Sequence, residues 1–159
     1  MHRVAKMPLV LDQAFELVEL LIAFAGTVLP NWEVYSGIAY MDGEIVTGPA
    51  STQGKEPLGV PRFSGNVWTT YKPGGGSWEI GGGLRGSSGF WLNDANTGKV
   101  PAYHTIDATI AYVQPHYEVR FNAINLTDET YYVGGYQNAP NRVLPASPRA
   151  YAITLRYIF

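Results

Sequence analysis

Residues 149–159, with the sequence RAYAITLRYIF, alternate between two kinds of side chain along their whole length. One face is aromatic and apolar and the other is mostly small or polar: Tyr151, Ile153, Leu155, Tyr157 and Phe159 against Ala152, Thr154, Arg156 and Ile158. Such period-two alternation predicts a β-strand whose two faces meet different environments. The length also suits a tilted strand that crosses a bilayer, which takes about 9–11 residues. We therefore predict that residues 149–159 form a membrane-spanning β-strand.

The same alternation recurs towards the N-terminus, with turn-forming residues between the segments. It predicts strands over residues 32–45, 62–71, 78–90, 103–113, 117–125 and 149–159. Most of these segments are longer than the usual globular strand of about 5–6 residues. That length favours strands that cross a membrane over the strands of a soluble domain.

The connections between these strands are of two kinds. Short turns are predicted at residues 29–31, 72–77 and 114–116, and long loops rich in Gly, Pro, Asn and Ser at 46–61, 91–102 and 126–148. The turn at 29–31 would make residues 18–28 a seventh strand. Short turns at one end and long loops at the other are typical of an outer-membrane barrel.

Seven charged residues inside the predicted strands fall on the face opposite the apolar one, the first being Arg156 of the last strand. The other six are Glu33, Glu79, Arg85, Asp107, Glu118 and Arg120. A charge that faces lipid costs about 2–4 kcal/mol at the bilayer midplane, so a barrel wall requires this segregation. A soluble β-sandwich also segregates its faces, and it stays open as an alternative on this pattern alone.

Aromatic residues gather on the apolar face at the short-turn ends of the predicted strands. Trp32, Tyr71, Trp78, Tyr112, Tyr117 and Tyr157 form this predicted membrane-interface belt. A second group near the long loops contains Tyr40, Phe63 and Tyr151. Tyr and Trp are enriched at both membrane–water interfaces, whereas a soluble sandwich does not need aromatics at its turns. The two groups therefore favour the barrel wall.

The composition agrees with strands that face two environments. Only 15% of the 159 residues are charged, against about 25% in soluble proteins, yet mean hydropathy is −0.06. The net charge is −2 without a basic stripe, which argues against nucleic acid as a partner. The absence of Cys excludes disulfides and thiolate metal sites. No apolar run of about 20 residues exists for a helical span.

Residues 125–132, with the sequence NLTDETYY, resemble the Asn-Leu-x-Asp-x-x-Tyr-Tyr stretch near the end of TonB-dependent outer-membrane receptors. Residues 60–64, 101–107 and 148–159 look like the closing strands of that family, and their order is most similar to ferric-siderophore receptors. The position of Thr127 is often Phe in the family. The likeness covers roughly residues 26–159. It implies an all-β fold, an antiparallel transmembrane β-barrel wall made of the last six to seven strands of a 22-stranded barrel.

The resemblance also implies parts that this sequence does not contain. Family members have an N-terminal plug domain and a closed barrel, and an open sheet would leave unpaired edges in lipid. We therefore expect an incomplete piece of a receptor, with residues 26–159 as the C-terminal part of the barrel. Residues 1–25 are expected to be an atypical segment, irregular or helical, with a shifted start and a weak resemblance to a signal peptide.

The long loops carry the candidate ligand-binding residues. They combine aromatic rings with an arginine: Phe90, Trp91, Tyr131, Tyr132, Tyr136 and Arg142. Such groups hold an anionic, aromatic ferric chelate by stacking and charge. The alternative for each of them is loop packing or a place at the interface. The scattered His2, His104 and His116 suggest no metal site. We expect no cofactor, no catalytic residue and no enzyme.

The resemblance implies a role in TonB-driven uptake of a ferric siderophore at the outer membrane of a Gram-negative cell, for which this piece alone is not expected to suffice. Expected partners are outer-membrane lipid, the ferric siderophore and the barrel-assembly machinery, which would recognise Tyr157 and Phe159. The TonB complex is expected to act only through the missing plug. Two alternatives remain: a small plug-less barrel with a structural or adhesive role, and a soluble β-sandwich binding module.

Overall fold

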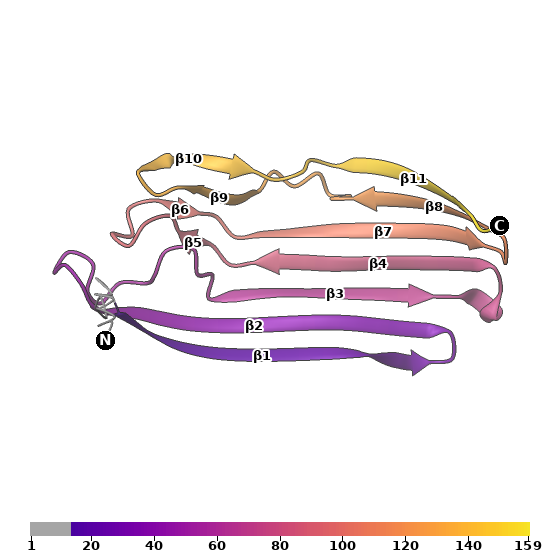
Figure 1. Cartoon of the computed structure of the whole chain (residues 1–159), viewed down its shortest axis with the longest axis horizontal. Coiled ribbons are helices and arrows are strands. Elements are labelled where there is room, and N and C mark those ends of the chain that lie inside the picture. Colours follow the sequence, from indigo (N-terminus) through magenta and orange to yellow (C-terminus); the bar gives the residue numbers. More distant parts are fainter. Residues whose placement is uncertain (1–13) are drawn as a thin grey trace, which may run out of the picture.

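The computed structural model describes residues 14–159, in which seven long strands form one antiparallel sheet in the order β1-β2-β3-β4-β7-β8-β11. Their bounds are β1 (Ala14–Leu29), β2 (Trp32–Thr47), β3 (Phe63–Tyr71), β4 (Trp78–Ser87), β7 (Tyr103–Val113), β8 (Tyr117–Ile124) and β11 (Ala150–Tyr157). Figure 1 shows these strands side by side, with short turns at one end and long connections at the other. The predicted all-β class is confirmed, and so are the six strands predicted between residues 32 and 159.

The long connections contain two short strand pairs that the sequence pattern did not predict. They are β5 (Phe90–Trp91) with β6 (Lys99–Val100), and β9 (Tyr132–Tyr136) with β10 (Ala139–Pro145). Neither pair shows alternation, because the first is two residues long and the second has register shifts. Within residues 14–159 the only helical element is the 3₁₀ helix η1 (Pro73–Gly75), and no helix is long and apolar enough to cross a membrane.

The strand register places the two kinds of side chain on opposite faces of the sheet. One row of the polar face contains Glu79, Ala111, Arg120 and Thr154, and the neighbouring row of the apolar face contains Ile80, Ile110, Phe121 and Ile153. Between the two aromatic rows the predicted confinement of strand charges to one face is confirmed; Asp42 and Glu44 of β2 share the face of Tyr40 but lie beyond it, on the side of the long connections. Ile80 and Ile153 remain 49% and 70% exposed, so nothing within residues 14–159 covers the apolar face as the second sheet of a soluble sandwich would.

Aromatic side chains lie in two rows across the apolar face, one at each end. At the short-turn end the ring centroids of Trp78 and Tyr112 are 5.0 Å apart, and at the other end those of Tyr40 and Phe63 are 5.4 Å apart. Trp32 and Tyr40 lie eight residues apart in β2, which corresponds to roughly 26 Å along the strand. A strand tilt of about 35–45° reduces this to roughly 20 Å of depth, close to the apolar band of about 25 Å on membrane barrels.

Strand β1 corrects one prediction. Residues 1–25 were expected to be irregular or helical. Residues 14–25 instead pair with β2 from Ala14 onward. Residues 1–13 lie outside the described residues. The alternation is weak because β1 is apolar on both faces, with Leu20 and Ile22 on the apolar face and Leu21 on the polar one. The seventh strand proposed for residues 18–28 is confirmed. Glu19 points to the polar face and Glu16 lies beyond the second aromatic row.

Gly83 is needed because the ring of Trp68 lies across it on the polar face. An added Cβ at Gly83 would come within 2.5 Å of Trp68 Cε3 and 2.6 Å of the Val67 carbonyl oxygen, whereas at Gly82 the nearest atom would be 3.4 Å away. We expect Gly83→Ala to lower the free energy of unfolding by about 1–3 kcal/mol through overpacking. Gly82→Ala should be neutral or slightly stabilising, because it restricts the unfolded chain. Urea unfolding in detergent micelles would measure both variants, and equal losses would contradict this account.

Candidate functional site

The three long connections pack together into one layer, which we call the loop cap and which comprises residues 48–62, 88–102 and 126–149. The first two connections interlock through side chains. Lys55 Nζ donates to the Ala95 carbonyl at 2.7 Å, and Asn96 Nδ2 donates to the Glu56 carbonyl at 2.9 Å. The third connection joins them where the buried Leu92 lies against Gly135. Figure 1 shows the strands of the loop cap, β5, β6, β9 and β10, at the end opposite the short turns.

The six loop residues predicted to contact a ligand come from, or lie next to, β5, β9 and β10. Tyr131 is only 8% exposed and stacks on Tyr103 of β7, with ring centroids 4.4 Å apart. It therefore packs the loop cap onto the wall, which was the alternative given for such a residue. The other five are half-buried or exposed: Phe90, Trp91, Tyr132, Tyr136 and Arg142. The Nζ of Lys99 lies 4.9 Å above the Trp91 ring as a cation–π contact.

The residues predicted for a belt and an assembly signal share the short-turn end of the sheet. Trp32, Tyr71, Trp78, Tyr112, Tyr117 and Tyr157 occupy the apolar face there, in three cross-strand pairs. Tyr157 and Phe159 meet edge to face, with centroids 5.0 Å apart. The amide of Ile158 donates to the His116 carbonyl at 2.9 Å, which continues the pairing past the end of β11.

Ion pairs connect the strands across the polar face. Arg120 on β8 lies 2.9 Å from Glu79 Oε1 and 2.7 Å from Glu118 Oε1, and Lys72 Nζ lies 3.5 Å from the other oxygen of Glu79. Only 15% of the Glu79 side chain and 20% of the Glu118 side chain are exposed. Each carboxylate thus receives a countercharge close to where water is partly excluded, which its burial requires.

Asn125 joins the two ends of the longest connection. Its side chain is fully buried, its Nδ2 donates to the carbonyls of Glu129 (2.9 Å) and Ser147 (3.3 Å), and its Oδ1 accepts from the Glu129 amide at 2.9 Å. Its backbone amide donates to Asp107 Oδ1 at 2.7 Å. Asp128 repeats this role by accepting from the Arg149 amide at 3.3 Å. Asn125 and Asp128 thus both bond backbone where the strand ladder ends and the long connection begins.

A hollow of about 400 Å³ opens on the polar face beside the loop cap. One cross-strand row has large side chains at both ends and small ones between them: Leu21, Ala39, Ser64, Ser87 and Tyr103. Asn66 and Arg85 line the hollow from the next row. We call this the polar hollow. Arg85 and Tyr103 were not named as site residues from the sequence, because only the register of five strands places them together.

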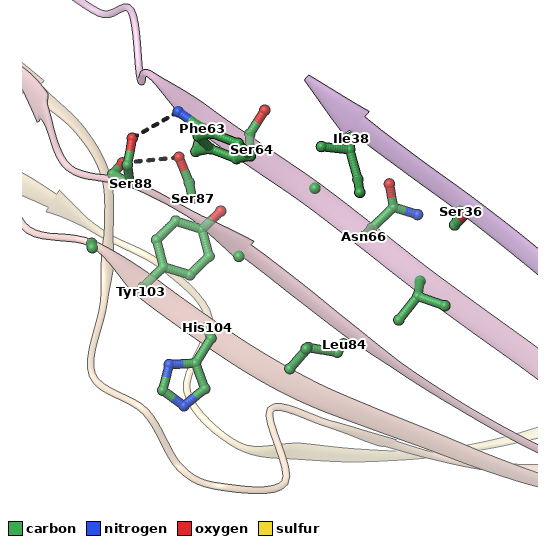
Figure 2. A pocket seen from close by; sticks show the side chains of 14 residues that line it. Ser36, Ile38, Phe63, Ser64, Asn66, Leu84, Ser87, Ser88, Tyr103 and His104 are labelled. Atoms are coloured by element: carbon green, nitrogen blue, oxygen red, sulfur yellow. Dashed lines mark hydrogen bonds between the residues drawn. The ribbon is translucent and has the colours of Figure 1, made fainter. Parts of the chain in front are cut away.

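A second hollow, of about 550 Å³, lies behind it on the apolar face. Its floor comes from the row Ile38, Gly65, Gly86 and His104, whose two central positions have no side chain. Figure 2 shows this hollow between β2, β3, β4 and β7, with the hydrogen bonds from the Phe63 amide to Ser88 Oγ and from Ser87 Oγ to the Ser88 carbonyl. The sheet is thin here because glycines occupy the same place in two neighbouring strands.

The polar face and the loop cap together offer binding chemistry. Arg85, Asn66 and Tyr103 provide hydrogen-bond donors around the polar hollow, and Tyr131 of the loop cap stacks on Tyr103 at its edge. Within residues 14–159, no group of three or more His, Asp or Glu side chains is arranged to hold a metal ion. The arrangement suits an anionic or aromatic solute held by donors and stacking.

Comparison with known protein families identifies a membrane-receptor barrel. Residues 15–126 match the family model described as TonB dependent receptor-like, beta-barrel. A probable TonB-dependent receptor, BfrD of Bordetella pertussis, is 32% identical over a 131-residue alignment that covers 74% of this chain and 17% of the relative. The catecholate siderophore receptor Fiu of Escherichia coli K12 is 29% identical over a 147-residue alignment that covers 87% of this chain and 19% of the relative. The chain thus spans about a fifth of the length of these relatives.

Solved structures share the arrangement of strands. The siderophore receptor PiuA of Acinetobacter baumannii superposes with a TM-score of 0.83 at 23% identity, over 91% of this chain and 22% of that one. The ferric yersiniabactin uptake receptor FyuA of Yersinia pestis gives 0.82 at 15% identity, over 93% and 24%. At these identities the likeness establishes the fold, a part of a receptor barrel.

The ion pairs of Arg120 should stabilise the sheet more than the exposed ion pairs of Arg62. Arg120→Gln removes the ion pair of the half-buried Glu118 and leaves Glu79 with only the more distant Lys72. We therefore expect a loss of about 1–3 kcal/mol in the free energy of unfolding. Arg62 pairs with Asp42 at 3.4 Å but its side chain is 57% exposed, and Arg62→Gln should cost less than about 1 kcal/mol. Denaturant unfolding in micelles would compare the two variants. A larger loss for Arg62→Gln would show that the polar-face pairs do not support the wall.

Proposed function

Because this chain belongs to the family of TonB-dependent receptors through its match to their β-barrel, we propose that it forms part of an outer-membrane receptor wall. The proposed ligand of that receptor is a ferric siderophore. The observation that carries the proposal is the division of a single sheet into an apolar face bounded by two aromatic rows and a polar face crossed by ion pairs. A membrane barrel needs both faces at once. Complete transport also needs a plug and the remaining wall, so we propose that this piece does not transport alone.

The apolar face is proposed to contact lipid. Its exposed side chains include Ile80, Leu84, Ile110 and Leu155, with exposed fractions from 41% to 74%. Leaving so much apolar surface in water is unfavourable at about 25 cal/mol per Å², whereas hydrocarbon removes that penalty. The two aromatic rows would then lie at the two headgroup levels, where Tyr and Trp prefer to be.

The polar face and the loop cap are proposed to face the route of the solute. Relatives and structural neighbours are named for ferric chelates of several kinds, among them catecholates, preacinetobactin and yersiniabactin. Those names support a ferric siderophore as the class of ligand without selecting one chelate. Trp91, Tyr132, Tyr136 and Arg142 are the loop-cap residues proposed to contact it, because they remain half-buried or exposed.

Further partners follow from the family and are proposed with it. The barrel-assembly machinery would recognise the C-terminal aromatic pair Tyr157 and Phe159, and the TonB complex would act through a plug domain. The adhesive plug-less barrel has no specific observation in its favour. The soluble β-sandwich conflicts with the uncovered apolar face described above.

Depth-dependent quenching tests whether the apolar face meets lipid. One variant keeps Trp78 as the only tryptophan and a matched variant keeps Trp68, with the other tryptophans replaced by Phe. Trp78 is 52% exposed on the apolar face, while Trp68 lies on the polar face over Gly83. In vesicles of brominated lipids we expect strong quenching of Trp78 by bromines near the headgroup and weak quenching of Trp68 at every depth. Equal quenching of the two residues would refute the proposed orientation of the wall.

A further inference from the structure

Arg85 is held in a fixed orientation at the edge of the polar hollow. Its Nε donates to Thr105 Oγ1 at 3.1 Å, and its Nη2 lies 3.5 Å from Asp107 Oδ2. Thr105 is fully buried, so the first contact comes from a side chain that cannot move freely. Among residues 14–159, Nη1 of Arg85 has no hydrogen-bond partner, and 46% of the side chain is exposed. A guanidinium fixed on one side and open on the other is arranged to receive an anionic oxygen.

Asp107 connects this arginine to the longest connection of the loop cap. While Oδ2 faces Arg85, Oδ1 accepts the backbone amide of Asn125 at 2.7 Å. Asn125 in turn joins both ends of residues 126–149 through Glu129 and Ser147. One carboxylate therefore orients the arginine and anchors the base of the loop.

Tyr103 makes a second connection between the same two places. It lines the polar hollow from β7 and stacks on the buried Tyr131 of the loop cap. The amide of Ala146 donates to the Tyr131 carbonyl at 3.0 Å, so the stacked ring belongs to the returning part of the loop as well. If residues 126–149 become less ordered, the positions of Asp107 and Tyr103 at the hollow therefore change with them.

We propose that the polar hollow is a subsite for an anionic oxygen group of the ferric chelate, with Arg85 as the contacting residue, and that Asp107 links its occupancy to the order of residues 126–149. This inference rests on the proposed function. Asn66, Ser64 and Ser87 add neutral hydrogen-bonding groups to the hollow, which suit the remaining polar atoms of a chelate.

The sign of the linkage follows from the shared carboxylate. Arg85 is presented to the anion only while Asp107 stays in place, and Asp107 stays in place while it accepts from Asn125. The state that binds the anion is thus the state in which the loop base is anchored. Linkage is reciprocal, so anion binding increases the order of residues 126–149, and loosening the loop base weakens anion binding.

Binding of two iron chelates of different charge to the full chain in micelles tests the subsite. The probes are iron(III) tris(2,3-dihydroxybenzoate), which is anionic, and iron(III) held by a linear trihydroxamate, which is not. Quenching of tryptophan fluorescence reports binding, because Trp68 lies on the same face as Arg85. We expect Arg85→Gln to weaken binding of the anionic probe about tenfold or more, as loss of a charge-assisted hydrogen bond does, and to change the trihydroxamate about twofold at most. Arg156→Gln, a polar-face arginine on β11, should change neither.

Tryptic cleavage after the exposed Arg142, identified by mass spectrometry, tests the linkage. The anionic probe should slow this cleavage in the parent chain but not in Asp107→Asn, which keeps the size of the side chain and loses its charge. Heat-modifiable migration of each variant controls for folding. If the parent chain binds neither chelate, the proposed function is wrong and the subsite is lost with it. Two other results would show that this inference is wrong while the proposed function stands. One is that Arg85→Gln binds the anionic probe as tightly as the parent chain; the other is that the probe slows tryptic cleavage of Asp107→Asn as much as that of the parent chain.

Discussion

The exclusion of charge from hydrocarbon is the constraint on which this structure depends. Every side chain of a seven-stranded sheet points to one of its two faces. The register places Glu79, Arg85, Asp107 and Arg120 together on the same face. Once confined to that face, these groups lie within reach of one another and neutralise one another in pairs. The opposite face can then be apolar throughout, and the aromatic rows mark where it begins and ends. A single charge on the lipid-facing side would cost a substantial part of the free energy of unfolding of an ordinary domain.

Alternation allowed most of this wall to be predicted from the sequence, because a side chain facing lipid and one facing the lumen obey opposite rules. The strands from Trp32 onward and the charged face were both predicted from local pattern. Strand β1 was the exception. Its polar face carries Leu21 and Ala25, so alternation disappeared, and only pairing with β2 identifies it as part of the sheet. Local pattern fails where a strand is apolar on both sides.

The site was less predictable, because it depends on register between strands distant in the sequence. Tyr131 looked like an exposed loop aromatic but packs on Tyr103, twenty-eight residues away along the chain. Arg85 looked like an ordinary wall charge, and its importance comes from Thr105 and Asp107 on the next strand. The interlocked connections of the loop cap likewise depend on hydrogen bonds such as that between Lys55 and Ala95, which cannot be predicted from sequence periodicity.

The pairing of charges on the polar face has a consequence for how a solute would travel past it. Lys72 and Arg120 face Glu79 and Glu118, and Arg85 faces Asp107, so the fields of neighbouring groups largely cancel at a distance. Long-range steering needs an excess of one sign over an extended surface, and this surface has little excess. A charged solute on this face would therefore meet no strong long-range attraction or repulsion and would be retained only where an individual group is presented to it. Selectivity on such a wall is a matter of short-range fit and not of net potential.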